Sequence, residues 1–156
     1  MANHWIIVGS PGNVAKSREL GWTVQGIKSR HRKKAQEMHP GDTFIYYVTG
    51  VQAFAGIVEV TSDYWEDHET PIWQSKDPKK AGEDYPFRVK IKPVLILDAT
   101  DWLPAIDVVP QMEYPKRWPA EHWHLAFQGN VHKISAADHA IIAEALAARV
   151  PVGSQR

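Results

Sequence analysis

The chain contains no cysteine among its 156 residues. Disulfides, thiolate metal sites and a cysteine nucleophile are therefore excluded, and the absence is compatible with a reducing compartment. No apolar run is long enough to span a bilayer, and the first residues lack the basic segment that begins a secretory signal. We therefore expect a cytoplasmic protein that makes no use of a membrane.

An excess of charge of either sign is also missing, because 18 Lys and Arg residues balance 18 Asp and Glu residues. Attraction to a polyanion would have to come from cations gathered on one face. Hydrophobic residues make up 44% of the chain and charged residues 23%, which are ordinary proportions for a globular protein. The length predicts a single domain over residues 1–156 with a core of its own.

The motifs of common catalytic sites are absent too: there is no Walker loop, no GxGxxG, no nucleophile elbow and no HExxH. Among the eight histidines, His122 and His124 would share one face of a strand, and His132 follows soon after. No carboxylate or further histidine stands at a recognisable ligand spacing from them. We therefore expect no metal, no cofactor and no enzymatic activity.

The first positive signal in the sequence is a short apolar run, Trp5 to Val8. It predicts a buried strand over residues 4–9. Asn13 is expected to cap a helix over about residues 14–20, with Gly21 at its end. A polar stretch that is compatible with a helix follows. Further along, two β-rich runs predict a hairpin, whose strands are Thr43–Val48 and Ala53–Val60.

The second half of the chain is less regular. Residues 64–84 lack periodicity and predict a long surface excursion, whereas residues 86–97 alternate as a strand with one wet face does. A short helix that Pro104 and Pro110 interrupt is expected over 102–112, and Ser135 is expected to cap a final helix over about 136–149. The element order predicts an α+β fold with a mostly antiparallel, barrel-like sheet.

The strongest functional pattern lies in the first forty residues. Small polar residues at 10–13 are followed by Gly21-Trp22-Thr23 and then by a basic cluster. An exposed tryptophan in such a loop suits stacking on a flat base, while nearby cations hold phosphates. Two alternatives stay open, because Trp22 would equally serve as a core anchor and the basic run as a solvated helix face.

An ordered set of pieces resembles the EVE domain family, which belongs to the PUA-like superfamily. The pieces are Trp5–Asn13, Gly21-Trp22, Pro40-Gly41-Asp42 with Tyr46-Tyr47-Val48, Phe54–Ile57 through Val60–Ser62, Thr70–Trp73, Tyr85–Val89 and the tail from Gly129 to the helix at Asp138. The resemblance implies a compact, mostly antiparallel β-barrel flanked by short helices, with a C-terminal helix. The family is similar to the YTH domain, which reads methylated adenine in RNA. EVE domains are thought to recognise modified bases, notably modified cytosines in DNA.

The resemblance also implies a base-binding pocket. Ser10, Pro11 and Asn13 match the segment that lines one edge of it. Trp22 matches an aromatic cage residue, Thr23 the small residue after it, and Trp73 a second cage aromatic. Three further aromatic residues are candidates to close the pocket, namely Tyr46, Tyr47 and Trp118, and we expect at least one of the two tyrosines to pack in the core instead.

Phosphate contacts would fall to cations near this pocket, and we expect no metal site. The candidates are Lys28, Arg30, Arg32, Lys33, Lys34 and Arg88. Each phosphate contact would release counterions and make binding depend on salt. For Arg88, a salt bridge within the barrel is an equal alternative.

These observations together predict a nucleic-acid reader of a modified base, with a modified cytosine in DNA as the first candidate. DNA is preferred to RNA as the partner, and a separate effector such as a nuclease would act on the signal. One alternative is an RNA-binding module for modified or structured RNA. The other is a nucleoside or amide hydrolase that uses a histidine, such as His31 or His124, or a carboxylate in the same pocket.

Overall fold

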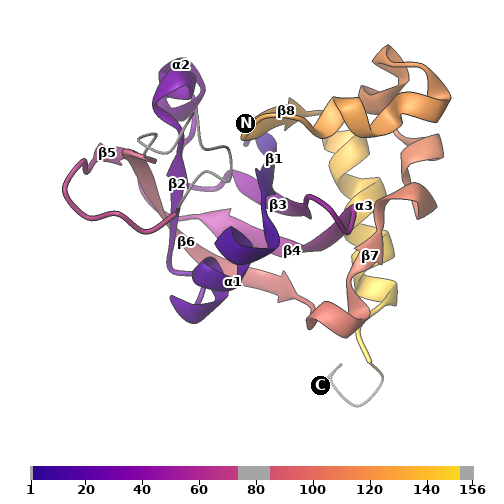
Figure 1. Cartoon of the computed structure of the whole chain (residues 1–156), viewed down its shortest axis with the longest axis horizontal. Coiled ribbons are helices and arrows are strands. Elements are labelled where there is room, and N and C mark those ends of the chain that lie inside the picture. Colours follow the sequence, from indigo (N-terminus) through magenta and orange to yellow (C-terminus); the bar gives the residue numbers. More distant parts are fainter. Residues whose placement is uncertain (1, 74–84, 152–156) are drawn as a thin grey trace.

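The computed structural model describes residues 2–73 and 85–151, and within them a curled sheet forms the centre of the molecule (Figure 1). Its main strands, in spatial order, are β2 (Val24–Ile27), β6 (Phe87–Ile96), β4 (Ala53–Val60), β3 (Thr43–Val48), β1 (His4–Gly9) and β8 (Val131–Ile134). Two short strands lie off this path: β5 (Trp65–Glu66) pairs with β6, and β7 (Leu103–Pro104) pairs with β4. The sheet is a mixed half-barrel, because β1 runs parallel to β3 while the other described pairs are antiparallel. The predicted α+β fold is confirmed.

Helical segments cover this sheet. The α-helices are α1 (Pro11–Glu19), α2 (Arg32–Gln36) and α3 (Ala136–Ala148), and the 3₁₀ turns are η1 (Ser29–His31), η3 (Ala99–Asp101), η4 (Ala105–Asp107), η5 (Val109–Gln111), η6 (Tyr114–Arg117) and η7 (Ala120–Phe127). In Figure 1, the segment between β7 and β8 winds through short turns on the side of α3. The predicted C-terminal helix is confirmed, and Ser135 caps it by accepting a hydrogen bond from the backbone nitrogen of Asp138 at 3.1 Å.

The sheet has an apolar core on each face. Along β3, Phe44 and Tyr46 belong to one core, which also receives α1, whereas Ile45 and Tyr47 belong to the other, which receives α3. This division follows from the strand geometry, because alternate side chains point to opposite faces. Strands that are covered on both faces read as continuous apolar runs, which explains the sequences of β1 and β3.

The prediction that Asn13 caps the first helix is wrong. Ser10 is the N-cap, and its side chain accepts a hydrogen bond from the backbone nitrogen of Asn13 at 3.2 Å. Pro11 then occupies the first helical turn, where a missing N–H costs nothing. The helix ends at the C-cap Leu20, and Gly21 follows in a left-handed conformation with φ of 70°.

The interruption predicted within residues 102–112 is observed, but the pieces are not α-helical. That range instead holds β7, η4 and η5, because Pro104 and Pro110 prevent a continuous helix. Within the predicted excursion over 64–84, residues 65–66 form β5, while residues 74–84 lie outside the described part of the chain. No helix in the described ranges is both long and apolar enough to cross a membrane.

Candidate functional site

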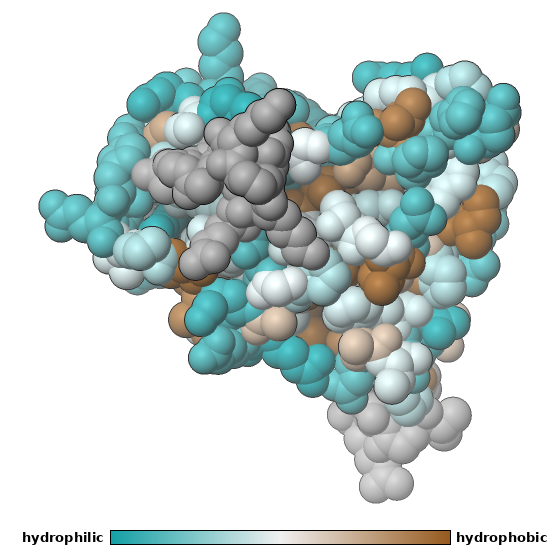
Figure 2. Space-filling view, viewed as in Figure 1, coloured by the Kyte–Doolittle hydropathy of each residue, from teal (hydrophilic) through white to brown (hydrophobic). Residues whose placement is uncertain are grey.

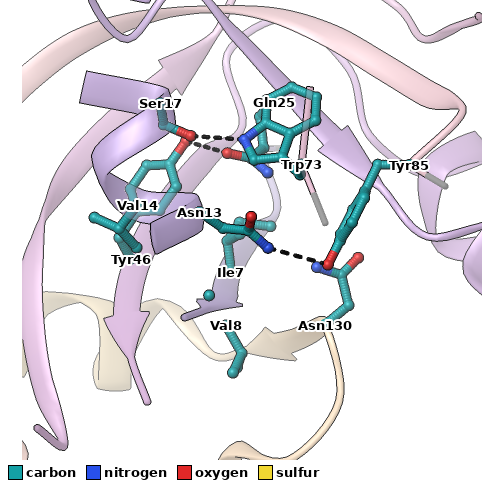
Figure 3. A pocket seen from close by; sticks show the side chains of 11 residues that line it. Ile7, Val8, Asn13, Val14, Ser17, Gln25, Tyr46, Trp73, Tyr85 and Asn130 are labelled. Atoms are coloured by element: carbon teal, nitrogen blue, oxygen red, sulfur yellow. Dashed lines mark hydrogen bonds between the residues drawn. The ribbon is translucent and has the colours of Figure 1, made fainter. Parts of the chain in front are cut away.

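A narrow cavity lies beside the C-terminal end of β1 and the inner face of α1 (Figure 3). Three aromatic rings stand there beside four amide and hydroxyl side chains from distant parts of the chain. The lining residues are Ile7, Val8, Gly9, Asn13, Val14, Ser17, Gln25, Tyr46, Trp73, Tyr85 and Asn130. The cavity volume is about 10 Å³, so the side chains leave room for about one water molecule.

Trp73, for which the family resemblance implies the role of a second cage aromatic, lines this cavity. Its ring nitrogen donates a hydrogen bond to Oγ of Ser17 at 3.0 Å, and only 4% of the residue is exposed. The ring of Tyr85 lies nearly edge-on to it, with centroids 6.0 Å apart and planes at 60°. A Cβ atom at Gly26 would approach the Trp73 ring to 2.5 Å. The two rings can therefore pack against β2 only because this position has no side chain.

Tyr46 lines the cavity from β3, as the sequence suggested. Its hydroxyl donates to Oε1 of Gln25 at 2.6 Å, and Nε2 of Gln25 donates to the carbonyl oxygen of Gly26 at 2.9 Å. Burial raises the pKa of Tyr46, which keeps the phenol neutral and able to donate. This pair holds the inner end of the site in one arrangement.

Two asparagines bring further polar atoms to the cavity. Nδ2 of Asn13 donates to the hydroxyl of Tyr85 at 3.3 Å (Figure 3). Oδ1 of Asn130 accepts from the backbone nitrogen of Lys28 at 2.9 Å, although the residue is only 2% exposed. Because that bond fixes which end of the amide is oxygen, Nδ2 of Asn130 points the other way. This amino group has no hydrogen-bond partner among the residues that the structure describes.

Trp22 does not line the cavity, and the prediction that it is exposed is wrong. It is 7% exposed and belongs to the core on the α1 face of the sheet. Its ring packs edge-on against Tyr46, with centroids 4.9 Å apart. Trp22 is therefore a core residue, which was the alternative interpretation of the sequence. It contacts Tyr46 and does not reach the cavity itself.

Four other predicted pocket residues also lie away from the cavity lining. Ser10 is occupied as the cap of α1, Pro11 is exposed in its first turn, and the Thr23 hydroxyl donates to the carbonyl oxygen of Leu20 at 2.8 Å. Trp118 packs in the opposite core, with its ring 5.6 Å from that of Tyr114. Of the predicted pocket set, the structure brings together Asn13, Tyr46 and Trp73.

The predicted phosphate-binding cations differ in what their side chains contact within the protein. Arg30 and Lys33 are exposed and have no carboxylate partner within the described residues. Lys28 lies over the ring of Tyr85, with Nζ 5.7 Å from the centroid, and so borders the cavity. Arg32 instead pairs with Glu66 at 2.9 Å, and Nζ of Lys34 donates to the carbonyl oxygen of Val131 at 2.9 Å.

Arg88 is a structural residue, which corrects its place among the phosphate-binding candidates. It is 4% exposed and its guanidinium lies 5.6 Å from the Trp73 ring centroid. The guanidinium donates to Asp67 Oδ2 at 3.1 Å, to the carbonyl oxygen of Tyr85 at 3.2 Å, and to the carbonyl oxygen of Thr70. The salt-bridge alternative is therefore the one observed, and Arg88 steadies the segment that carries Trp73.

Histidines gather next to the basic group without forming a metal site. Burial, followed by the charge of Lys34, lowers the pKa values of both His31 and His132 to about 4. Nδ1 of His132 is 2.9 Å from the hydroxyl of Tyr114. His122 and His124 are both exposed on η7. No group of three or more His, Asp or Glu side chains suited to a metal occurs in the described ranges.

Sequence reasoning missed four polar or aromatic lining residues, namely Ser17, Gln25, Tyr85 and Asn130. A signal existed for two of them. Gln25 is the one polar side chain in β2, and Tyr85 begins a matching piece of the family pattern. Ser17 and Asn130 carry no such signal, because their roles appear only when α1 and the start of β8 meet at the cavity.

The curled sheet with flanking helices places the chain in the class of YTH and PUA-like folds. The YTH domain of the Zygosaccharomyces rouxii MRB1 protein, solved in complex with N6-methyladenosine RNA, superimposes with a TM-score of 0.65 at 16% identity, over 93% of this chain and 86% of that one. A hypothetical protein from Leishmania major gives a TM-score of 0.63 at 16% identity, over 96% and 97% of the two chains.

The sequence comparison defines the family more narrowly. The EVE domain model matches residues 3–145, so the chain belongs to the EVE domain family. A UPF0310 protein of Pyrococcus abyssi is 29% identical over 124 residues, which are 74% of this chain and 82% of the relative. The predicted family is confirmed.

Proposed function

We propose that the cavity bordered by Trp73, Tyr85 and Tyr46 binds a single modified base of a nucleic acid. The observation that carries this proposal is the meeting of three aromatic rings with the amides of Asn13 and Asn130 in one place. Aromatic rings stack on either face of a base, and fixed amides recognise its hydrogen-bonding edge. The polymer-bound N6-methyladenosine of the structurally similar yeast domain supports the same class of ligand.

Base entry requires the cavity to widen, since its volume is about 10 Å³. Trp73 is the wall that can yield, because a single hydrogen bond to Ser17 holds its ring nitrogen. Stacking on an aromatic ring stabilises the bound base by roughly 1–3 kcal/mol. Extruding a base from a duplex costs on the order of a few kcal/mol, so a single-stranded or already unpaired base binds at a lower cost.

Discrimination between modified and unmodified bases has to come from more than one methyl group. Burial of a methyl contributes only about 0.8 kcal/mol. A stronger preference arises when the wrong base leaves a void or an unpaired polar group in the closed site. Nδ2 of Asn130 supplies such a group, because a base without an acceptor opposite it would leave the amino group unbonded.

We take a modified cytosine in DNA as the first candidate, and a modified base in RNA as the alternative. The O2 and N3 atoms of cytosine are acceptors that an amide N–H can meet, and adenine presents ring-nitrogen acceptors of the same kind. Arg30 and Lys33, which are exposed and have no carboxylate partner within the described residues, are proposed to contact phosphates together with Lys28 beside Tyr85, and to make binding weaken with salt. A separate effector such as a nuclease would then act on the bound site.

We propose binding without catalysis, because the polar side chains at the cavity are amides and hydroxyls. Among the residues that the structure describes, no histidine, aspartate or glutamate lines the cavity. These are the usual general acids and bases at neutral pH. A hydrolase at this site would need its acid–base group from elsewhere in the chain.

The experiment is an affinity panel on matched oligonucleotides. The strands carry 5-methylcytosine, 5-hydroxymethylcytosine, N6-methyladenine or no modification, each as DNA and as RNA, single-stranded and in a duplex. The proposal expects at least a roughly tenfold preference for one modification over its unmodified parent. Equal affinity for every strand, or measurable affinity for none, would overturn it, and the DNA–RNA pairs decide between the two candidates.

A substitution series locates the site. Trp73→Ala should weaken binding by at least about tenfold, whereas Trp73→Phe, which keeps an aromatic face, should weaken it less. Trp118→Ala changes the same residue type in the opposite core and should leave affinity unchanged. If Trp118→Ala reduces affinity as much as Trp73→Ala does, the base does not bind at this cavity.

A further inference from the structure

A second hollow lies in the layer of 3₁₀ turns between β7 and β8, on the face of the sheet that packs against α3. We call it the tryptophan groove, and its principal residues are Ile106, Val109, Pro110, Lys116, Trp118 and Trp123. Its volume is about 440 Å³, within the range of sites that take a ligand or a side chain of a partner. In Figure 2, brown side chains reach the surface on the right of the view, where Figure 1 draws these turns.

The groove is apolar and held in shape by packing beneath it. The Trp118 ring lies 5.6 Å from Tyr114 and the Trp123 ring 6.2 Å from Phe127, both measured between centroids. Both indoles are half-buried, so one side of each rests on the core and the rest faces outward. Ile106 is 52% exposed at the edge, which is a large exposure for an isoleucine next to two indoles.

A basic hollow of about 370 Å³ lies on the other side of η6 and shares Lys116 with the groove. It is also lined by Arg117 and Lys133, of which Lys133 reaches Glu37 only at 4.0 Å. Lys116 and Arg117 make no ion pair with any other described residue. Cations that are not neutralised attract carboxylates, so this side of the groove has a charge preference.

Two carboxylates line the same hollow, but one of them is already satisfied. Asp138 is 1% exposed and accepts from the backbone nitrogens of Glu113 and Tyr114 at 2.8 and 2.9 Å. Glu113 is the other. The described lining of the hollow therefore has three cations and two carboxylates, and Asp138, one of the two carboxylates, is already hydrogen-bonded to the backbone.

We infer that the tryptophan groove and the basic hollow together dock an acidic segment of a partner protein, with one bulky apolar side chain in the groove and carboxylates next to it. Apolar anchors supply most of the binding energy at such sites, and complementary charge supplies selectivity. The segment would be extended or helical, as in the common modes of peptide recognition.

This surface is separate from the proposed base site. Asn130 immediately precedes β8, whereas Ile134 and Ser135 at its other end line the basic hollow. Four strand residues span roughly 13 Å. The groove residues belong to the core on the α3 side, while Tyr46 and Val14 at the cavity belong to the other core. A partner and a nucleic acid could therefore occupy the chain together.

The test uses a phage-displayed library of random twelve-residue peptides selected on the full chain, with counter-selection on a Trp123→Ala/Lys116→Glu double variant. The proposal expects enriched peptides that pair an aromatic residue or leucine with at least two Asp or Glu residues. It is overturned if no peptide distinguishes the wild type from the variant, or if basic or uncharged peptides dominate. It is also overturned if an unmodified oligonucleotide displaces the selected peptides, since the surface would then bind phosphates.

Two controls keep the result interpretable. Lys92→Glu reverses an exposed charge on β6 and should retain the selected peptides with less than about twofold loss. The single variant Lys116→Glu covers the case in which the double variant fails to fold, and should weaken the peptides at least about tenfold. Base affinity should be unchanged in Lys116→Glu, so failure of this proposal and failure of the base site are told apart.

Discussion

In the proposed site, Asn130 is the residue on which selective reading of a base would depend most. Its amide oxygen accepts from the backbone nitrogen of Lys28, which orients its amino group as a donor for a ligand. A buried amide with one end fixed is a directional donor, because its rotation would break the existing bond. Nothing in the local sequence marks this asparagine, since its position depends on a contact between the residue after β2 and the residue before β8.

Replacing this residue tests the donor. Asn130→Asp keeps an oxygen for the Lys28 amide but removes both donors, and should weaken binding of the preferred oligonucleotide by roughly tenfold or more. The measurement is a titration by fluorescence anisotropy. Asn3→Asp makes the same chemical change at a residue whose side-chain amide, within the described part of the chain, bonds only to the carbonyl oxygen of Glu37, and should have no effect. Equal losses in the two variants would contradict the role of Asn130.

Ser10, unlike Asn130, was expected at the edge of the pocket from the family resemblance, but in the structure it caps α1 and does not line the cavity. Ser10→Ala should lower the free energy of unfolding by about 1 kcal/mol while leaving base affinity unchanged. Ser135→Ala removes the equivalent cap of α3 and should cost a similar amount. Urea unfolding measures both. A loss of base affinity in Ser10→Ala without a loss of stability would show that Ser10 takes part in base binding.

At the scale of elements, the sequence predicted those segments whose pattern is strong and local. β1, the β3–β4 hairpin, β6 and α3 were all expected close to where they lie. The structure of residues 102–132 could not be predicted in this way. The 3₁₀ turns there are too short to show a hydrophobic period, and Pro104, Pro110 and Pro115 interrupt the sequence pattern. The tryptophan groove lies in this segment.

β2 positions the Trp73 wall through a missing side chain. Gly26→Ala would bring a Cβ to 2.5 Å from the Trp73 ring and 2.7 Å from Cβ of Tyr85. The two rings must then shift, and we expect both lower stability and at least a roughly tenfold loss of base affinity. Gly12→Ala is the matched control, since its nearest neighbour would be Oγ of Ser10 at 4.0 Å. Unchanged affinity in Gly26→Ala would show that the wall is not part of the site.

At the scale of the whole molecule, the cavity is assembled from segments that are far apart in sequence. Asn13, Tyr46 and Trp73 were predicted, whereas Trp22 was assigned to the wall and belongs to the core. A Gly-Trp-Thr loop looks exposed from its composition alone. Its burial depends on α1 folding back over β3, which is a tertiary event that no local pattern reports.

Acid should destabilise the whole fold through two half-buried histidines, His31 and His132. The pKa values of His31 and His132 are lowered from 6.5 to about 4 in the folded chain. The unfolded chain therefore binds more protons between these values. The stability that the neutral rings contribute is complete above pH 6.5 and is lost as the pH falls towards 4.

Urea unfolding at pH 7 and pH 5 measures this loss. His132→Gln should reduce the difference between the two pH values, whereas His122→Gln, at an exposed position, should leave it as in the wild type. If the free energy of unfolding were the same at both pH values, or if the two variants behaved alike, the burial of these rings would not be coupled to folding.

The measurement that tests the central claim most directly is a ¹⁵N NMR titration of the tryptophan indole N–H groups with the preferred modified oligonucleotide. We predict that the Trp73 signal shifts and saturates with the base, while the signals of Trp118 and Trp123 stay in place. Saturation of the Trp118 or Trp123 signals with an unmoved Trp73 signal would place the nucleic acid on the other face of the sheet and contradict the account.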